Sequence, residues 1–182
     1  LNPETPTRAT GIVVNVNDIG TFKKLGVAGK APRGAIAFKY PAEEATTIVE
    51  DIVVHIGRTG ALTPVAHLKP VKVAGVTISR ASLHNIDEIN RLGIKIGDTV
   101  IVQRAGDVIP DITKVLAGLR TGKEKEFHMP KNCPVCGDSV MRLEGEAAHK
   151  CVNKKCPAKK RENLYHFVSK KAFNIIGLGP KI

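Results

Sequence analysis

The sequence predicts a mainly β protein with small α parts, and three observations lead to that class. Short runs of β-branched residues recur between 45 and 116, and glycine or proline bounds most of them. One helical segment falls between the third and the fourth run, and all four cysteines lie within 133–156. Five strands with a helix in that place are typical of an OB-fold barrel, and the cysteines predict a separate zinc-ribbon module. A β-sandwich or an SH3-like barrel is the alternative for the strands alone.

Two strands are expected before the barrel, at 11–16 and 35–40, because apolar side chains recur there at the spacing of a strand. A turn-rich stretch separates them. Lys39 lies inside the second strand, where burying a lysine is costly without a partner anion. The lysine therefore either faces an anion or belongs to an edge strand on which water solvates it.

The strands of the barrel are predicted from apolar runs separated by turn residues; their ranges are 46–56, 62–68, 71–79, 98–104 and 109–116. Pro64 and Pro70 fall among them. Because proline cannot donate to a strand ladder, we expect both at sheet edges or strand ends.

The helix of the barrel is expected at 86–92. Asn85 can cap its first turn with Glu88 three residues on, and Gly93 marks its end. A polar stretch after the barrel is interpreted as a linker. Beyond the cysteines, 158–168 is expected to form a second helix with three cations in its first turn.

Positive charge is concentrated near the end of the sequence. The chain carries 28 Lys and Arg against 17 Asp and Glu, and residues 150–182 alone hold nine cations and one acid. Such a segment favours a polyanion, most often nucleic acid, with a merely solvated surface as the alternative. Aromatic residues make up only 4% of the chain, so we expect contacts to phosphates rather than base stacking. The apolar runs are only a few residues long, so no membrane-spanning segment is predicted.

The four cysteines have the spacing of a structural metal site. Cys133 and Cys136 form a C-x2-C pair, and Cys151 and Cys156 form a wider C-x4-C pair. Four thiolates complete the tetrahedron of Zn²⁺ and leave no open position for a catalytic water. Two disulfides are the alternative. We expect the metal, because the sequence shows no basic-then-apolar leader and so favours a reducing compartment.

Two expected turns of the barrel combine arginine with glycine. Arg58 and Thr59 lie in the first turn, and Arg104 begins the second. Such a turn lets the backbone and a guanidinium approach one phosphate together. Arginine in a turn is also commonly just solvated, so these residues alone do not decide the matter.

Six distinctive stretches occur in a fixed order: APRGAIAFKYP at 31–41, GRTGALTPV at 57–65, SLHN at 82–85, RAGDVIP at 104–110, the four cysteines, and NIIGLG at 174–179. In this order they closely resemble one family, the NAD-dependent DNA ligases of bacteria, over almost the whole chain. The resemblance implies the C-terminal end of an adenylation domain at 1–44, an OB-fold at 45–118, a linker at 119–130, a four-cysteine zinc finger at 131–158, and the start of a helix-hairpin-helix region at 159–182.

The resemblance also implies roles for individual residues. Lys39 falls in the motif whose lysine contacts the phosphate of the nucleotide, so it is the expected cofactor-binding residue. DNA contacts around the nick are implied for Arg58, Thr59, Arg104, Val108 and Ile109. The zinc ligands are expected to be Cys133, Cys136, Cys151 and Cys156.

The sequence departs from the family pattern at its beginning. An upstream motif of the family has an acidic residue and a lysine that assist nucleotide chemistry, and Thr10 and Asn15 hold those places here. Residues 1–10 also differ from the family, and both ends look cut from a longer chain. Lys-x-Asp-Gly, which contains the lysine that becomes adenylated, does not occur. We therefore expect this chain to be inactive by itself, with no catalytic residue of its own.

The resemblance implies that the parent protein seals nicks in double-stranded DNA through enzyme-adenylate and DNA-adenylate intermediates, in replication and repair. It implies a structural zinc, with NAD and Mg or Mn for the complete enzyme. We expect a monomer in the bacterial cytoplasm, associated with the nucleoid and not with a membrane. The alternative from another class is a non-catalytic module, a barrel with a zinc ribbon that only positions DNA or RNA.

Overall fold

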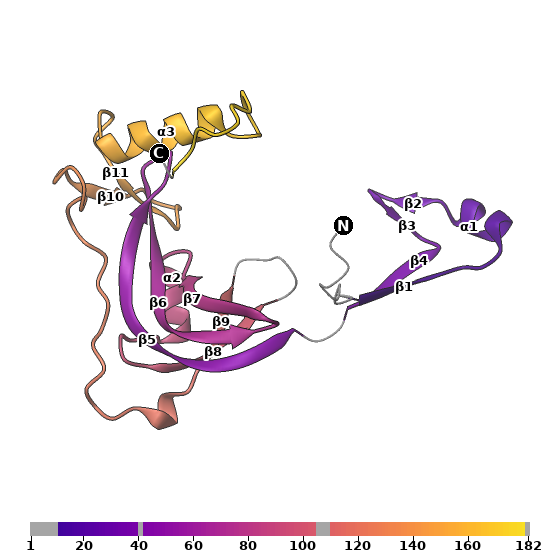
Figure 1. Cartoon of the computed structure of the whole chain (residues 1–182), viewed down its shortest axis with the longest axis horizontal. Helices are drawn as coiled ribbons and strands as arrows, with labels where there is room; N and C mark the ends of the chain where they lie inside the picture. The colour runs from indigo at the N-terminus through magenta and orange to yellow at the C-terminus, as the bar shows by residue number, and fades with distance from the viewer. Residues whose placement is uncertain (1–10, 40–41, 105–109, 181–182) are drawn as a thin grey trace.

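The computed structural model describes residues 11–39, 42–104 and 110–180 (Figure 1). A small hairpin unit lies apart from a larger body that contains the barrel and the cysteine module. The strands of the barrel are β5 (Glu43–Ile56), β6 (Ala61–Val73), β7 (Val76–Ser82), β8 (Thr99–Arg104) and β9 (Asp111–Val115).

The barrel is closed. β5 pairs antiparallel with β6 and with β8, β6 pairs with β7, and β8 pairs with β9. A parallel bridge between Ser82 of β7 and Asp111 of β9 completes the ring. This strand order, with one helix between β7 and β8, confirms the predicted OB-fold over the alternatives.

The interior of the barrel is apolar and receives side chains from all five strands. Its buried members are Val49, Ile52, Ala66, Leu68, Val73, Ile78, Ala81, Leu83, Ile89, Ile94, Val100, Val102 and Ile112. Val49 and Ile52 are both buried although three positions separate them, because the register of β5 shifts between Val49 and Asp51. Such a bulge exchanges the two faces of a strand and bends it, so β5 can follow the barrel wall over its length.

One strand boundary predicted from the sequence is wrong. We expected a strand at 71–79 after a break at Pro70, but β6 continues to Val73 and β7 begins at Val76. The two residues between these strands have φ of 50° and 78°, as a tight hairpin turn requires. They are an Ala-Gly pair, which is a weaker turn signal than proline, and the sequence therefore placed the turn too early.

Both prolines of β6 lie inside the strand, contrary to the expected edge or end positions. Pro64 is buried, and its C=O accepts a hydrogen bond from the N–H of Leu83 at 3.0 Å. The Pro64 nitrogen points to the same side as its C=O and away from β5, so the missing N–H removes no bond to β5 and affects the pairing only where β7 has ended. Pro70 falls within the register shift between β6 and β7, where the ladder is already interrupted.

The helix of the barrel, α2 (Ile86–Leu92), has the predicted limits. Asn85 Oδ1 accepts from the N–H of Glu88 at 2.9 Å and so caps the first turn. Gly93 ends the helix in the left-handed conformation, with φ of 61°. The capping signals in the sequence are confirmed at both ends.

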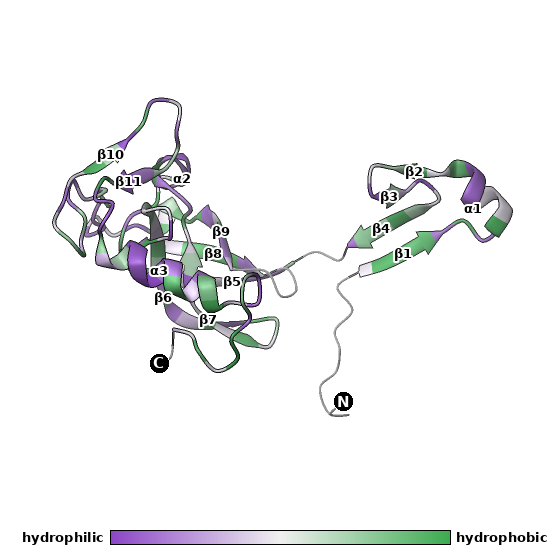
Figure 2. Cartoon of the chain, turned by 90° about the horizontal axis from the view of Figure 1, so that it is seen from above, coloured by the Kyte–Doolittle hydropathy of each residue, from purple (hydrophilic) through white to green (hydrophobic). Residues whose placement is uncertain are grey.

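The hairpin unit consists of β1 (Gly11–Asn15) and β4 (Ala35–Lys39), paired antiparallel, which confirms the two expected strands. Three short elements lie between them: α1 (Ile19–Leu25), β2 (Val27–Ala28) and β3 (Ala31–Pro32). Figure 2 shows that β1 and β4 are largely hydrophobic along their length. Many of these side chains are exposed, among them Val13 at 63% and Phe38 at 58%.

The sequence did not predict α1, which has seven residues and contains a glycine and a threonine. Its weak propensity is compensated at both ends. Asp18 Oδ1 accepts from the N–H of Thr21 at 2.8 Å, and Gly26 ends the helix with φ of 66°. Asp18 as an N-terminal cap and Gly26 as a C-terminal stop are the sequence features that could have predicted this helix.

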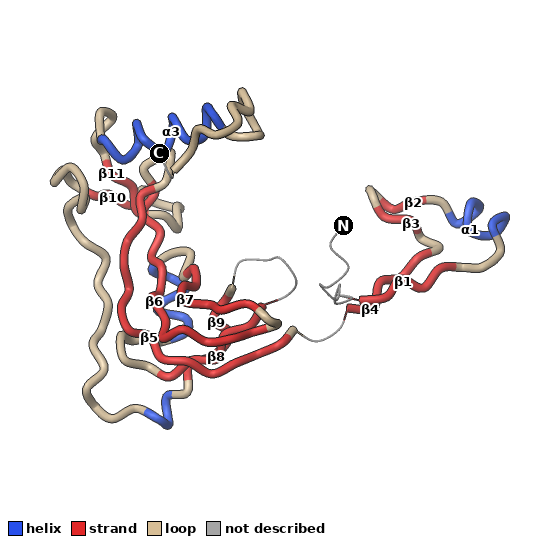
Figure 3. Tube along the Cα trace, in the orientation of Figure 1, coloured by secondary structure: helices blue, strands red, loops and turns tan. Residues whose placement is uncertain are grey.

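The cysteine module follows the barrel and is built from β10 (Val140–Arg142), β11 (His149–Cys151) and α3 (Pro157–Val168). β10 pairs with β11, and β11 pairs antiparallel with β6, so the module extends the sheet of the barrel (Figure 3). The predicted helix at 158–168 is confirmed as α3. None of the helices in the described ranges is long and apolar enough to cross a membrane.

The polar stretch between barrel and module is fastened to the barrel. It begins after a 3₁₀ turn, η1 (Ala117–Leu119). Arg120 donates to both carboxylate oxygens of Asp98, at 2.7 and 2.8 Å, and the Asp98 side chain is fully buried. These bonds raise the pKa of Arg120. Lys125 exchanges two backbone hydrogen bonds with Ile96, which adds a further attachment.

We predict that Arg120→Met lowers the free energy of unfolding by about 2 kcal/mol, because it leaves the Asp98 carboxylate buried without its cation. Urea unfolding followed by far-ultraviolet circular dichroism measures the change. Lys95→Met is the matched control, since it removes an exposed pair with Glu126 and should change stability little. Equal, small losses in the two variants would contradict the importance of the buried pair.

Candidate metal centre and nucleic-acid interface

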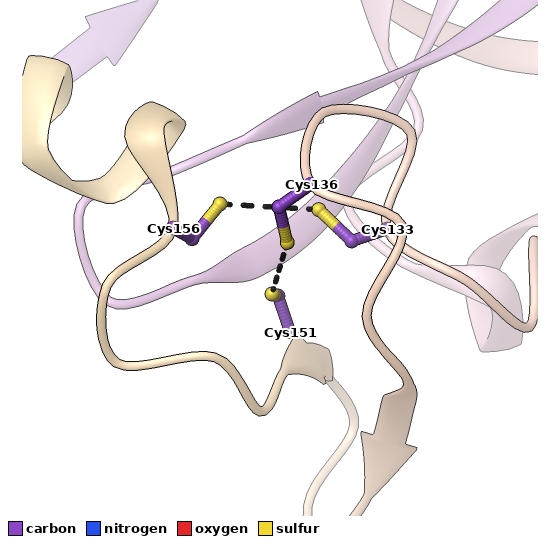
Figure 4. A group of neighbouring side chains, drawn as sticks. All are labelled: Cys133, Cys136, Cys151 and Cys156. Carbon is purple, nitrogen blue, oxygen red and sulfur yellow. Dashed lines mark hydrogen bonds between the residues drawn. The ribbon is translucent and has the colours of Figure 1, made fainter.

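The four cysteine sulfurs converge on one point (Figure 4). All lie within 4.8 Å of one another. The Sγ atoms of Cys133 and Cys156 are 3.9 Å apart, and those of Cys136 and Cys151 are 3.6 Å apart. A tetrahedron with Zn–S bonds of about 2.3 Å has edges of about 3.8 Å, so the cluster has the dimensions of a Zn²⁺ site.

The same distances exclude the disulfide alternative. A disulfide joins sulfurs at about 2.05 Å, and all four cysteines are free. Three of them are buried, namely Cys133, Cys151 and Cys156. A buried cluster of thiols supplies soft ligands for a metal and little access for a substrate, which fits a structural site.

Local backbone geometry positions the first pair of ligands. The N–H of Gly137 donates to the C=O of Cys133 at 2.9 Å, and the N–H of Cys133 donates to the C=O of Asp138 at 2.7 Å. Gly137 has φ of 76°, so it turns the chain sharply after Cys136. The resulting knuckle brings two sulfurs three residues apart to one point.

Sulfurs of the cluster shift the pKa values of their neighbours, and a bound cation would stabilise the thiolate forms. Burial alone would raise the pKa of Cys133, but the N–H groups of Cys136 and Val135 and the neighbouring thiols lower it to about 7. Burial is the largest cause that raises the pKa of Cys151. At Cys136, the N–H of Asp138 favours the thiolate, but burial and the other three sulfurs raise its pKa to about 12. Several thiolates this close repel one another, and a divalent metal removes that conflict.

The turn that carries Arg58 and Thr59 lies against this module. It connects β5 to β6, and both side chains are exposed. The N–H of Cys151 donates to the C=O of Gly60 at 3.0 Å, and β11 continues the pairing along the first residues of β6. The sequence predicted the metal ligands and this turn separately, and the structure places them side by side.

Arg104 is the other predicted DNA-binding residue that the structure describes, and it lies far from this turn. It ends β8 and pairs in register with Glu43, at the opposite end of β5 from Arg58. Val108 and Ile109 lie outside the described residues. The two described arginines therefore occupy the two ends of one long strand.

Lys39 is exposed at the end of β4 and faces Gly11 in register on β1. A Cβ at Gly11 would lie 2.6 Å from the C=O of Phe38, so only glycine permits this close approach of the two strands. Asn15 is at the other end of β1, and Thr10 lies outside the described residues. The structure brings Lys39 together with neither Arg58 nor the cysteines.

Sequence reasoning missed the contacts that join the module to the barrel. Arg142 of β10 forms a bidentate ion pair with Asp87 of α2, at 2.9 and 2.7 Å. Lys159 of α3 donates to the C=O of Cys151 within the module at 2.8 Å, and its stem lies against Gly60 of the barrel. Each contact involves partners that are distant in sequence or a backbone atom, so neither residue type nor spacing revealed them.

These features define a class of protein: a closed OB-fold barrel with a C4 zinc module attached to the edge of its longest hairpin. A family model described as the NAD-dependent DNA ligase OB-fold domain matches residues 46–124. A second, the NAD-dependent DNA ligase C4 zinc finger domain, matches residues 132–158. The four-cysteine cluster and this match together support a structural zinc.

Curated proteins named DNA ligase resemble the chain over nearly all of its length. The one from Halothermothrix orenii is 54% identical over 98% of the chain, and the one from Desulfitobacterium hafniense is 54% identical over 97%. The one from Syntrophus aciditrophicus is 52% identical over all 182 residues, so its match includes residues 1–10. The chain spans 27% of the length of each of these relatives.

The chain belongs to the NAD-dependent DNA ligase family, of which it contains the OB-fold and zinc-finger domains. The resemblance inferred from the sequence is thereby confirmed.

We predict one zinc per chain and loss of the β10–β11 structure when a strong chelator removes the metal, because metal binding supplies the folding energy of such a module. Elemental analysis and circular dichroism before and after chelation measure both effects. Cys136→Ser should reduce the zinc content, whereas Val135→Ser, an exposed neighbour in the same knuckle, should retain it. Equal zinc contents in the two variants would show that Cys136 is not a ligand.

Proposed function

We propose that this chain is part of a ligase that seals nicks in duplex DNA, and that it supplies the DNA-clamping barrel and the structural zinc finger. The observation that carries the proposal is the occurrence of two domains of one ligase family in order, within a chain that is 54% identical to proteins named DNA ligase. The complete protein then acts in the bacterial cytoplasm, as a monomer bound to nicked DNA near the nucleoid.

The division of the chain that we propose keeps five parts. Residues 1–44 end the adenylation domain, 45–118 form the OB-fold, and 119–130 connect it to the zinc finger at 131–158; helix-hairpin-helix sequence begins at 159. Metal ligation is assigned to Cys133, Cys136, Cys151 and Cys156, because their sulfurs match the edges of a zinc tetrahedron.

The chemistry of the complete enzyme is transfer of an adenylyl group, which NAD supplies when bound, with Mg or Mn as the metal cofactor. The residues of this chain assist by binding and by neutralising charge. Lys39 is assigned to the phosphate of the nucleotide, where its ammonium stabilises the negative charge that phosphoryl transfer concentrates on oxygen. This role requires Lys39 to stay protonated, so it is not the residue that becomes adenylated.

Binding of the duplex is assigned to the two arginine-containing turns. Arg58 and Thr59, exposed at the tip of the β5–β6 turn, contact the phosphate backbone, and Arg104 does so at the other end of β5. Val108 and Ile109 make apolar contacts to the minor-groove face. Contacts of these kinds read no base sequence, as a ligase that seals nicks in any sequence requires.

We predict that Arg58→Ala weakens binding to nicked duplexes of every sequence alike. It should also reduce the slope of log affinity against log salt by roughly one unit, because one phosphate contact is lost. Fluorescence anisotropy with a labelled nicked duplex at several salt concentrations measures both quantities. Lys123→Ala, which removes one exposed charge beyond the barrel, should change the slope less. An unchanged affinity and an unchanged slope for Arg58→Ala would show that Arg58 is solvated and contacts no phosphate.

We further predict that the chain binds DNA but forms no covalent adenylate with NAD, since it contains no Lys-x-Asp-Gly. Incubation with NAD labelled in its AMP moiety, followed by denaturing gel electrophoresis and peptide mapping, is the measurement. Fusion to the adenylation domain of a relative should restore labelling, and Lys39→Ala should then slow it severely. Label mapped to a lysine of the unfused chain would show that the chain itself contains the lysine that becomes adenylated, contrary to this prediction. Labelling of the fused chain that Lys39→Ala leaves unaffected would contradict the role of Lys39.

A further inference from the structure

The β5–β6 turn is closed by its own backbone but is held in place by the cysteine module. The N–H of Gly60 donates to the C=O of Gly57 at 2.9 Å, and the N–H of Gly57 donates to the C=O of Ala61 at 2.9 Å. These bonds shape the turn and leave Arg58 and Thr59 exposed at its tip. The ladder pair of Ile56 and Leu62 anchors both ends of the turn to β5 and β6, so what contacts from outside the turn can add is a fixed position for its tip.

The module makes such contacts at Gly60. Its C=O accepts from the N–H of Cys151 at 3.0 Å. The ammonium of Lys159 donates to the C=O of the same Cys151 at 2.8 Å, and its aliphatic stem crosses the open side of Gly60. A Cβ at Gly60 would overlap Lys159 Cε and lie 3.3 Å from the C=O of Cys151. Gly60 also has φ of 87°, so its conformation favours glycine, and a side chain here would displace the end of Lys159.

The position of Lys159 has no explanation in the stability of its own helix. It is in the first turn of α3, where the helix dipole disfavours a cation. Its neighbour Lys160 is exposed, whereas the Lys159 side chain is partly buried and bonded to the backbone. The ammonium therefore joins α3 to β11 within the cysteine module, and the stem of Lys159 lies against Gly60 of the barrel, so this side chain lies where the module meets the turn.

We propose that Lys159 is a positioning residue for the β5–β6 turn: it holds Cys151 against Gly60 and thereby aims Arg58 and Thr59 at the DNA. The proposal rests on the proposed function, in which these two residues contact the phosphate backbone. The ammonium of Lys159 donates to the C=O of Cys151, so Lys159 affects DNA binding through the position of the turn and not by contacting a phosphate.

The test compares Lys159→Met with Lys160→Met in the zinc-loaded chain, with zinc content measured for each variant. The two variants lose the same charge from the same helix turn. In ¹⁵N-labelled protein, Lys159→Met should shift the amide signals of Gly60 and Cys151 and speed hydrogen exchange at Gly60. Lys160→Met should leave both unchanged. A Gly60 amide that is the same in Lys159→Met as in the unaltered chain would overturn the proposal.

Binding to a fluorescein-labelled nicked duplex supplies the second readout. Lys159→Met should weaken the affinity about fivefold, since one charge-assisted hydrogen bond that fixes the turn is lost. The effect should largely vanish in an Arg58→Ala background, because the residue that Lys159 aims is then gone. Any effect of Lys160→Met should instead add to that of Arg58→Ala. A full, additive loss from Lys159→Met would mean direct DNA contact and would overturn positioning.

The two readouts also separate this proposal from the function on which it rests. If Arg58→Ala leaves DNA affinity unchanged, the DNA role of the turn fails, and the aiming of Arg58 fails with it. The Gly60 amide then still reports whether Lys159 holds the turn. If Arg58→Ala weakens binding but Lys159→Met leaves the amide signal and the hydrogen exchange of Gly60 unchanged, the proposed function stands and the positioning role is wrong.

Discussion

The pairing of β5 with β6 is the constraint on which the rest of this structure depends. The two strands are 14 and 13 residues long, and they are paired from Val49 to Ile56 of β5 with one register shift between Val49 and Asp51. One part of this ribbon lies in the barrel wall, where Val49 and Ile52 are buried. The other part runs beyond it, where Ile56 and Leu62 join a second cluster with the cysteines. Two hydrophobic cores therefore share one pair of strands.

The second core explains why a metal is needed at this place. A two-stranded ribbon is marginally stable in water unless something covers one of its faces. The module that covers it has short strands, and apart from the cysteines the buried apolar members of the cluster are Ile56, Leu62 and Ala158. So small a core cannot offset the entropy of ordering its chain. Zinc held by four thiolates supplies the missing free energy, and the ribbon gains a rigid cover at its tip.

The sequence predicted those features that are encoded locally. The limits of α2 were correct because Asn85 and Gly93 determine them by their own conformations. The four cysteine sulfurs converge as their spacing predicted, because that spacing is a local property. The end of β6 was wrong because a bulge in the ladder accommodates Pro70, and a single strand shows no sign of its partner's register. The contact of Lys159 with Cys151 could not be predicted, since it joins a side chain of α3 to a backbone carbonyl of β11 and depends on how these elements pack.

The length of β5 also determines how far apart the proposed DNA contacts at Arg58 and Arg104 lie. Fourteen residues of strand span at most about 46 Å, and B-DNA rises about 3.4 Å per base pair, so under the proposed function the phosphates bound by Arg58 and Arg104 lie at most about 13 base pairs apart. Charges at that separation are screened from each other at physiological salt, where the Debye length is about 8 Å. Under the proposed function, Arg58 and Arg104 therefore bind their phosphates independently, and the length of β5 limits how far apart those phosphates lie. The bulge between Val49 and Asp51 bends β5, and the cysteine module packs on its far end, so both features set the relative placement of the two positions.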